Sequence, residues 1–333
     1  MSWSISDLSE LVDFLGKKAD VYAPVGDTKT AFERLDGREP NVARLSDVSA
    51  RSVFQPLTHY YLRFEDRPDA DATFTDYDAS PRVVLGMRPC DVAALDVQDR
   101  VFAESESHRA LRDATTVVGL LCDRREDTCF CDSLGHGPHE TGGMDVVVYP
   151  VPQGGYVVRA ETDKGKELLA GAPFTEVSDP PEPTFEEREH PALETAGLAK
   201  SLKSLPKSDD PDAEGPDVWD DIAFACVNCR VCTYACPTCH CFTVTDEVFG
   251  TAGGRATVWD SCQNELFTKE ASGHNPRQSK GARARQRILH KYLYYPAVHG
   301  EIMCTGCGRC IRGCPTGRNI VEELTALKGV TSP

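Results

Sequence analysis

Eight cysteines in the last third of the chain repeat one spacing twice. In each run, two residues separate the first three cysteines from one another, three residues precede the fourth, and a proline follows it. The runs are Cys226, Cys229, Cys232, Cys236 with Pro237, and Cys304, Cys307, Cys310, Cys314 with Pro315. This spacing is typical of the ligands of two cubane iron–sulfur clusters. The repeated pattern predicts a chain that carries electrons.

Each cluster needs four thiolates, and a single run supplies three of them from one short loop. In two-cluster proteins with this spacing, the fourth cysteine of each run binds the other cluster. Cluster 1 is therefore expected on Cys226, Cys229, Cys232 and Cys314. Cluster 2 is expected on Cys304, Cys307, Cys310 and Cys236. The alternative metal is zinc, which also binds cysteine pairs of this spacing, but three evenly spaced cysteines before Cys-Pro disfavour it.

Four cysteines lie in the first half of the chain, at Cys90, Cys122, Cys129 and Cys131. Cys90 follows one expected strand and Cys122 ends the next. In a parallel crossover unit both strand ends open on the same edge of the sheet. The loop that follows carries the other two cysteines. Two interpretations stay open: a third four-thiolate cluster, or four unrelated cysteines.

Smaller features surround the two cysteine runs. Cys239 and Cys241 follow the first run so closely that one of them could replace Cys236 as a ligand, although packing is the simpler role for both and for Cys262. The backbone N–H groups of Gly306, Gly308 and Gly313 could bond to cluster sulfides. Lys and Arg residues gather between 269 and 291, where they would either raise a cluster's potential or form a solvated helix face. His274 either stands near a cluster or only caps a loop.

Composition and charge limit the classes of partner. The 333 residues carry a net charge of −16, whereas nucleic acid and anionic membranes require basic patches. No apolar run approaches the roughly 20 residues of a membrane span, and residues 1–18 lack the basic stretch followed by an apolar one that is typical of a leader peptide. We therefore expect a cytoplasmic protein. No glycine-rich nucleotide motif or hydrolase motif is present, so the sequence assigns no catalytic residue and no cofactor site beyond the cysteines.

The elements that must position these cysteines can be outlined from hydrophobic periodicity. We expect helices at 5–16, capped by Ser4 or Ser6, at 91–103 and at 280–295, with another near 185–204. Strands are expected at 83–86, 115–121, 144–151 and 155–160. Residues 1–177 are then an α/β or α+β domain, 178–218 an acidic proline-rich linker, and 219–333 a mainly α-helical two-cluster ferredoxin-like domain.

Five segments, in the same order, resemble one family. They are residues 86–102, 128–138, 226–242, 273–277 with 285–292, and 304–315. The family comprises the iron–sulfur beta subunits of cytoplasmic NAD(P)-linked nickel–iron sulfhydrogenases and the corresponding iron–sulfur subunit of the anaerobic sulfite reductase. The double cysteine motif occurs in many proteins, but the segments RPCD and TCFC are more specific to this family. The resemblance also favours the third cluster at Cys90, Cys122, Cys129 and Cys131.

The resemblance implies an electron-transfer subunit without a catalytic metal of its own, part of a multi-subunit oxidoreductase. Its [4Fe–4S] clusters would pass electrons between a flavin-containing subunit that handles NAD(P)H and a catalytic nickel–iron subunit with its small iron–sulfur subunit. A sulfite reductase subunit is the alternative within the same family. A self-sufficient iron–sulfur reductase of a small molecule is the alternative from another class, and Cys239, Cys241 and Cys262 keep it open.

Overall fold

The computed structural model describes residues 1–65, 67, 71–75, 80–205 and 218–330. Its contacts divide the chain into two compact units, each built from several segments. Unit 1 comprises Met1–Phe54, Asp78–Ala192 and Thr305–Arg309, and unit 2 comprises Gln55–Tyr77, Leu193–Cys304 and Cys310–Pro333. The three-part division expected from the sequence stays a prediction, and part of its acidic linker, residues 206–217, lies outside the described residues.

Unit 1 is built on a mixed sheet, for which the described residues supply eight strands. Their order is β10 (Thr175–Glu176), β1 (Ser2–Ile5), β9 (Tyr156–Ala160), β8 (Val146–Pro150), β7 (Thr115–Leu120), β6 (Arg82–Met87), β2 (Asp20–Val25) and β3 (Ala31–Arg34). The central strands β2, β6, β7 and β8 run parallel, and the flanking strands pair antiparallel. The four strands expected from periodicity are confirmed.

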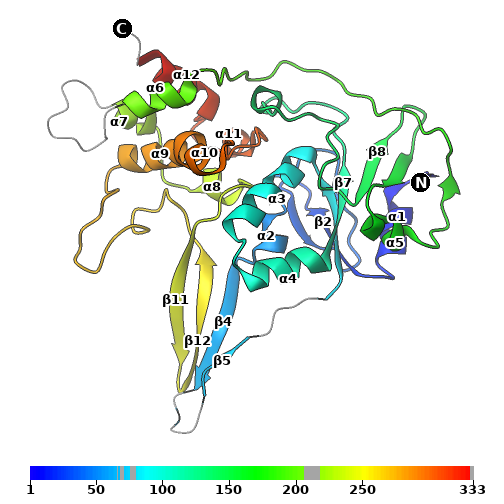
Figure 1. Ribbon diagram of the computed structural model, residues 1–333, viewed down its shortest axis with the longest axis horizontal. Helices are drawn as coiled ribbons and strands as arrows, with labels where there is room; N and C mark the ends of the chain where they lie inside the picture. Colours follow the sequence, from blue (N-terminus) through cyan, green and yellow to red (C-terminus); the bar gives the residue numbers. More distant parts are fainter. Residues whose placement is uncertain (66, 68–70, 76–79, 206–217, 331–333) are drawn as a thin grey trace. The chain divides into compact units, whose positions relative to one another are not determined.

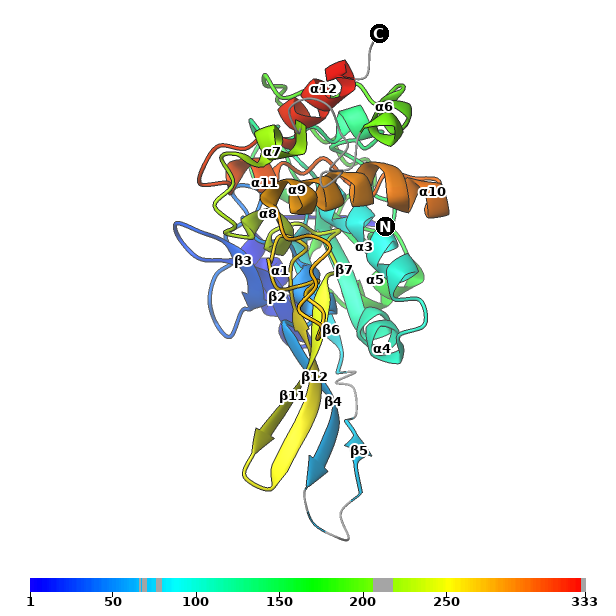
Figure 2. The ribbon, with the colours of Figure 1, turned by 90° about the vertical axis from the view of Figure 1, so that its left-hand side faces the viewer.

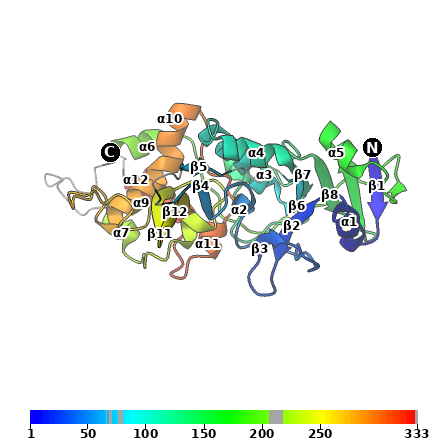
Figure 3. The same cartoon turned by 90° about the horizontal axis from the view of Figure 1, so that it is seen from below.

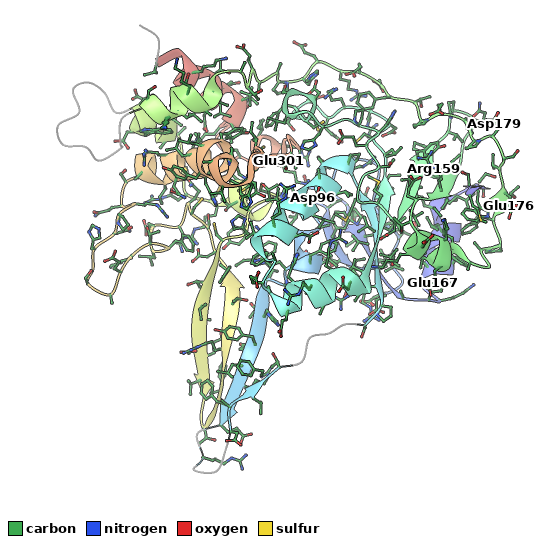
Figure 4. The ribbon with its side chains drawn as sticks, viewed as in Figure 1. Asp96, Arg159, Glu167, Glu176, Asp179 and Glu301 are labelled. Atoms are coloured by element: carbon green, nitrogen blue, oxygen red, sulfur yellow. The ribbon has the colours of Figure 1, made fainter. Side chains whose placement is uncertain are left out.

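Two helices connect β6 to β7, namely α3 (Pro89–Val101) and α4 (Glu106–Ala114). Because β6 and β7 pair in parallel, this segment is the crossover unit that the sequence predicts. The residues on β6 alternate between two cores: Val83 and Leu85 pack with α1 (Leu8–Leu15), and Val84 packs with α3 and α2 (Arg51–Phe54). Figure 3 shows α3 and α1 on opposite sides of the strands. Helix α3 is amphipathic, and Asp96 is exposed on its outer face (Figure 4).

Smaller elements complete unit 1. They are the 3₁₀ turn η1 (Asp132–Leu134) and the helix α5 (Asp163–Leu169), whose Glu167 is exposed (Figure 4). The expected first helix is confirmed, but its cap is Asp7 rather than Ser4 or Ser6. The Asp7 carboxylate accepts a hydrogen bond from the Ser9 N–H at 2.8 Å, and Glu10 closes a capping box.

Unit 2 combines helices with an antiparallel sheet. The described part of that sheet has four strands in the order β11 (Phe242–Phe249), β12 (Ala252–Trp259), β4 (Thr58–Glu65) and β5 (Thr73–Phe74). Figure 2 shows β11 and β5 at its two edges. The β11–β12 hairpin falls within the domain expected to be mainly α-helical, so that expectation is not confirmed.

The helices of the C-terminal half are short (Figure 1). They are α6 (Leu198–Ser204), α7 (Val218–Ala223), α8 (Val231–Tyr234), α9 (Lys280–Leu289), α10 (Tyr295–His299), α11 (Arg309–Arg312) and α12 (Ile320–Val330). The helix expected at 280–295 is confirmed as α9 and a π-helical turn, η2 (His290–Tyr294), continuing into α10. Of the helix expected near 185–204, only α6 forms. Among the described residues, no helix is both long and apolar enough to cross a membrane.

Candidate metal centres

One cavity of unit 1 gathers all four cysteines of the first half of the chain. Cys90 lies in the first turn of α3, directly after β6, and Cys122 follows β7. The loop after β7 brings Cys129 and Cys131 to the same place, and all four line one cavity. The parallel strands thus open on a common edge, as expected. Cys307, from the second cysteine run, also lines this cavity, which the spacing of the cysteines does not predict.

The segment 305–309 packs directly on the cysteine loop of unit 1. The Phe130 N–H donates to the Gly306 carbonyl at 2.8 Å, and the Cys129 thiol lies 3.8 Å from the Cys307 carbonyl. Gly306 and Gly308 both have positive φ, at 64° and 69°. A Cβ on Gly308 would lie 2.2 Å from the Thr128 carbonyl oxygen. Glycine is therefore required at this close approach, whatever bonds its N–H group makes.

A buried ion pair holds the same segment beside Cys90. The Arg309 guanidinium contacts the Asp91 carboxylate at 2.7 and 2.8 Å, and the two side chains are 0% and 1% exposed. Arg309 also donates to the Ser46 carbonyl at 2.8 Å and to its hydroxyl at 2.9 Å. Because water is excluded, this hydrogen-bonded ion pair fixes both backbones in one arrangement. Nothing in the sequence pattern signals it.

Burial controls the protonation of the unit 1 thiols. Loss of solvent raises the pKa of Cys90 well above its usual range, that of Cys122 to about 11 and that of Cys129 to about 12. The Arg88 guanidinium partly opposes this effect at Cys122. Arg88 is itself fixed by bonds to the Leu121 carbonyl at 2.8 Å and the Val42 carbonyl at 2.7 Å. Metal coordination deprotonates such thiols outright, so this buried set suits a metal cluster.

A second cavity, within unit 2, gathers the four cysteines expected to bind cluster 1. It is lined by Cys226, Cys229, Cys232, Cys314 and also by Cys310. The structure thus brings together the three cysteines of one run and the last of the other, as the exchange of fourth ligands requires. Arg287 and Arg318 line the same cavity and supply positive charge.

Cys314 differs from Cys232, which lines the same cavity. Partial burial would raise its pKa, but the Thr316 hydroxyl at 3.4 Å and the Arg318 N–H at 3.3 Å outweigh burial and lower it. By contrast, burial raises the pKa of Cys232 to about 11, against the influence of Arg287. The guanidinium of Arg287 is itself buried, and burial alone would lower its pKa. The sulfurs of Cys232 and Cys310 outweigh that effect and raise the pKa of Arg287.

The four cysteines expected to bind cluster 2 do not all belong to one unit. Cys236, Cys304 and Cys310 are counted with unit 2, and Cys307 with unit 1. Within unit 2, the Lys291 ammonium lies 3.4 Å from the Cys236 sulfur and 2.7 Å from the Thr238 hydroxyl. The Tyr292 hydroxyl lies beside Cys304; burial, together with that sulfur, raises the pKa of Tyr292.

Cys239, Cys241 and Cys262, the cysteines of unit 2 outside the two runs, each lie beside another cysteine. The Cys239 thiol donates to Cys236, which lowers the pKa of Cys236 and, with burial, raises that of Cys239. Cys262 is bonded in the same way to Cys241. Cys239 and Cys262 are buried, as packing residues would be. His274 is exposed, and its carbonyl accepts from the Glu270 N–H at 2.8 Å within a turn.

The donor sets fit cubane clusters better than single ions. In the described part of the chain, no three His, Cys, Asp or Glu side chains gather closely enough to hold one metal ion. A cubane spaces its four ligand sulfurs further apart than one ion does, and each cavity is lined by the four cysteines of a proposed set together with one more. Buried cations beside the thiols complement an anionic group. The sets at Cys90, Cys122, Cys129, Cys131 and at Cys226, Cys229, Cys232, Cys314 therefore suit such clusters.

Comparison with known proteins defines the class of protein. Residues 225–318 match the family model of the 4Fe–4S dicluster domain. Over 335 aligned residues, the chain is 30% identical to sulfhydrogenase 2 subunit beta of Pyrococcus furiosus, covering 96% of this chain and 95% of that protein. The chain belongs to the family of iron–sulfur beta subunits of sulfhydrogenases. No solved structure matches it.

Proposed function

We propose that this protein is the electron-transfer subunit of a cytoplasmic NAD(P)-linked nickel–iron sulfhydrogenase. The observation that carries the proposal is the cavity of unit 2 in which Cys226, Cys229, Cys232 and Cys314 meet. Thiolates so placed hold a redox group, and the surrounding cations and N–H groups set its potential. Membership of the sulfhydrogenase beta family supports the assignment to this complex.

The proposal includes three [4Fe–4S] clusters. Cluster 1 is held by Cys226, Cys229, Cys232 and Cys314, and cluster 2 by Cys304, Cys307, Cys310 and Cys236. Cluster 3 is held by Cys90, Cys122, Cys129 and Cys131, whose shared cavity supports it. The partners are a flavin subunit that handles NAD(P)H and a catalytic nickel–iron subunit with its small iron–sulfur subunit.

Anaerobic purification of the native complex tests this function. We expect about 12 iron and 12 acid-labile sulfide atoms for each copy of this chain alone, after separation under anaerobic conditions. A flavin subunit and a nickel-containing subunit should purify with it. Co-purification of a sirohaem subunit instead would assign the chain to a sulfite reductase. Zinc without sulfide would overturn the electron-transfer function.

Replacing Cys129 by Ala tests the third cluster. We expect the variant to lose about four iron atoms per chain, because one corner of the cubane loses its thiolate. Cys262→Ala is the control, since Cys262 is another free cysteine, which is buried and belongs to no proposed ligand set. Iron and sulfide analysis of both variants decides the question. Equal iron content in Cys129→Ala and the parent protein would reject cluster 3.

A further inference from the structure

Lys291 is a buried cation whose neighbours are sulfurs rather than carboxylates. Its side chain is 2% exposed. The ammonium lies 3.4 Å from the Cys236 sulfur and 2.7 Å from the Thr238 hydroxyl, and Cys239 and Cys304 also act on its charge. Within the described ranges, no carboxylate pairs with Lys291. A buried ammonium is costly unless a negative charge compensates for it, so this position requires an anionic group at Cys236.

The π-helical turn η2 (His290–Tyr294) gives Lys291 this position. A π turn shifts the direction of the side chains that follow it relative to a regular α-helix, and such turns are frequent at functional sites. Consecutive residues of η2 approach two proposed ligands of cluster 2: Lys291 approaches Cys236, and Tyr292 lies beside Cys304. Arg287, one turn earlier on α9, acts on Cys232 of cluster 1 as well as on Cys310 of cluster 2.

We propose that Lys291 is a fixed counter-charge for cluster 2 and raises the reduction potential of that cluster. This inference rests on the proposed ligand role of Cys236. Cluster potentials depend on net charge and on hydrogen bonds to the ligand sulfurs. A positive charge that water does not screen stabilises the reduced cluster more than the oxidised cluster, because the reduced cluster is more negative. Lys291 is thus a positioning and tuning residue, which binds no substrate.

A redox titration of the full chain, followed by electron paramagnetic resonance, tests this role. The signal of cluster 2 is identified as the one lost in Cys304→Ala. In Lys291→Met, we expect reduction of that cluster by one electron from dithionite to become about tenfold less favourable, which is about 59 mV for a one-electron step. The other signals should keep their potentials. In Lys291→Arg, which preserves the charge, the potential should stay close to that of the parent protein.

The matched control is Lys280→Met, which removes the same charge from an exposed position at the start of α9. Solvent screening predicts no change of potential there. An unchanged cluster 2 potential in Lys291→Met, or equal shifts in the Met and Arg variants, would overturn the inference. If Lys291→Met does not assemble cluster 2, the presence of that cluster in Lys291→Arg supports the charge role. Loss of cluster 2 in both variants overturns it. A parent protein without cluster signals would instead contradict the proposed function.

Discussion

Asp91 and Arg309 show how single residues are used to hold the proposed clusters in place. Asp91 follows Cys90 directly, and Arg309 lies two residues after Cys307. Their ion pair contains a hydrogen bond and is excluded from solvent. Each charge depends on the other, because a charge left alone in this environment would be strongly unfavourable.

We expect Arg309→Met to destabilise the protein by about 3–5 kcal/mol, since the buried Asp91 carboxylate would lose its partner. The free energy of unfolding, measured with denaturant under anaerobic conditions, checks this expectation. Lys166→Met is the control, because it breaks the exposed pair of Lys166 with Asp163 in the same unit. That variant should differ little from the parent protein. Comparable losses of unfolding free energy in both variants would show that burial of the Arg309–Asp91 pair is unimportant for stability.

The cysteines are predictable from the sequence, whereas the charges around them are not. Regular spacing is enough to group the two runs, and the parallel strand ends suggest that Cys90 and Cys122 meet. Arg309 and Lys291 carry no local signal, because their partners are 218 and 55 residues away in sequence. The basic stretch between 269 and 291 is visible in the sequence, but periodicity alone does not separate buried Lys291 from exposed Lys280.

At the scale of elements, the cysteine sites depend on the points where regular structure ends. Cys90 and Cys122 follow β6 and β7, and Lys291 lies in the π turn after α9. The loop 305–309 has two glycines with positive φ where it meets the cysteine loop of unit 1. These junctions orient the side chains, and the strands and helices keep the junctions rigid.

Gly308→Ala tests the close approach of this loop. A Cβ at this position would collide with the Thr128 carbonyl, and it would also require positive φ, which costs of order 1–3 kcal/mol. Gly317→Ala is matched, because Gly317 has φ of 70° but an added Cβ there would meet no atom within 4 Å. We expect Gly308→Ala to lower the unfolding midpoint more than Gly317→Ala. Equal midpoints would show that contact with Thr128 is unimportant.

At the scale of the whole molecule, the sequence predicts which helices and strands form better than it predicts which segments pack together in one unit. The parallel crossover unit is predictable because buried strands and an amphipathic helix alternate there. The β11–β12 hairpin is not predicted, although Phe242–Phe249 is rich in β-branched and aromatic residues, because the surrounding cysteine pattern suggests a helical domain. The grouping of Thr305–Arg309 with unit 1 depends on tertiary contacts that no local pattern encodes.

Removal of iron by an anaerobic chelator should affect the two units unequally. Unit 1 retains two hydrophobic cores around its sheet. Unit 2 would keep the buried cations Arg287 and Lys291 without their counter-charge, which is unfavourable. Hydrogen exchange should therefore accelerate more in α9 and η2 than in β6 and β7. Uniform acceleration throughout the described elements would contradict this prediction.

The late position of Thr305–Arg309 in the sequence has a consequence for biosynthesis. Unit 1 otherwise ends at Ala192, yet its cysteine cavity includes Cys307. During translation, the strands of this unit leave the ribosome long before the segment that completes its wall. We therefore expect the early thiols to stay accessible to cluster-delivery factors until residues 305–309 have been synthesised, because only then can this wall of the cavity form.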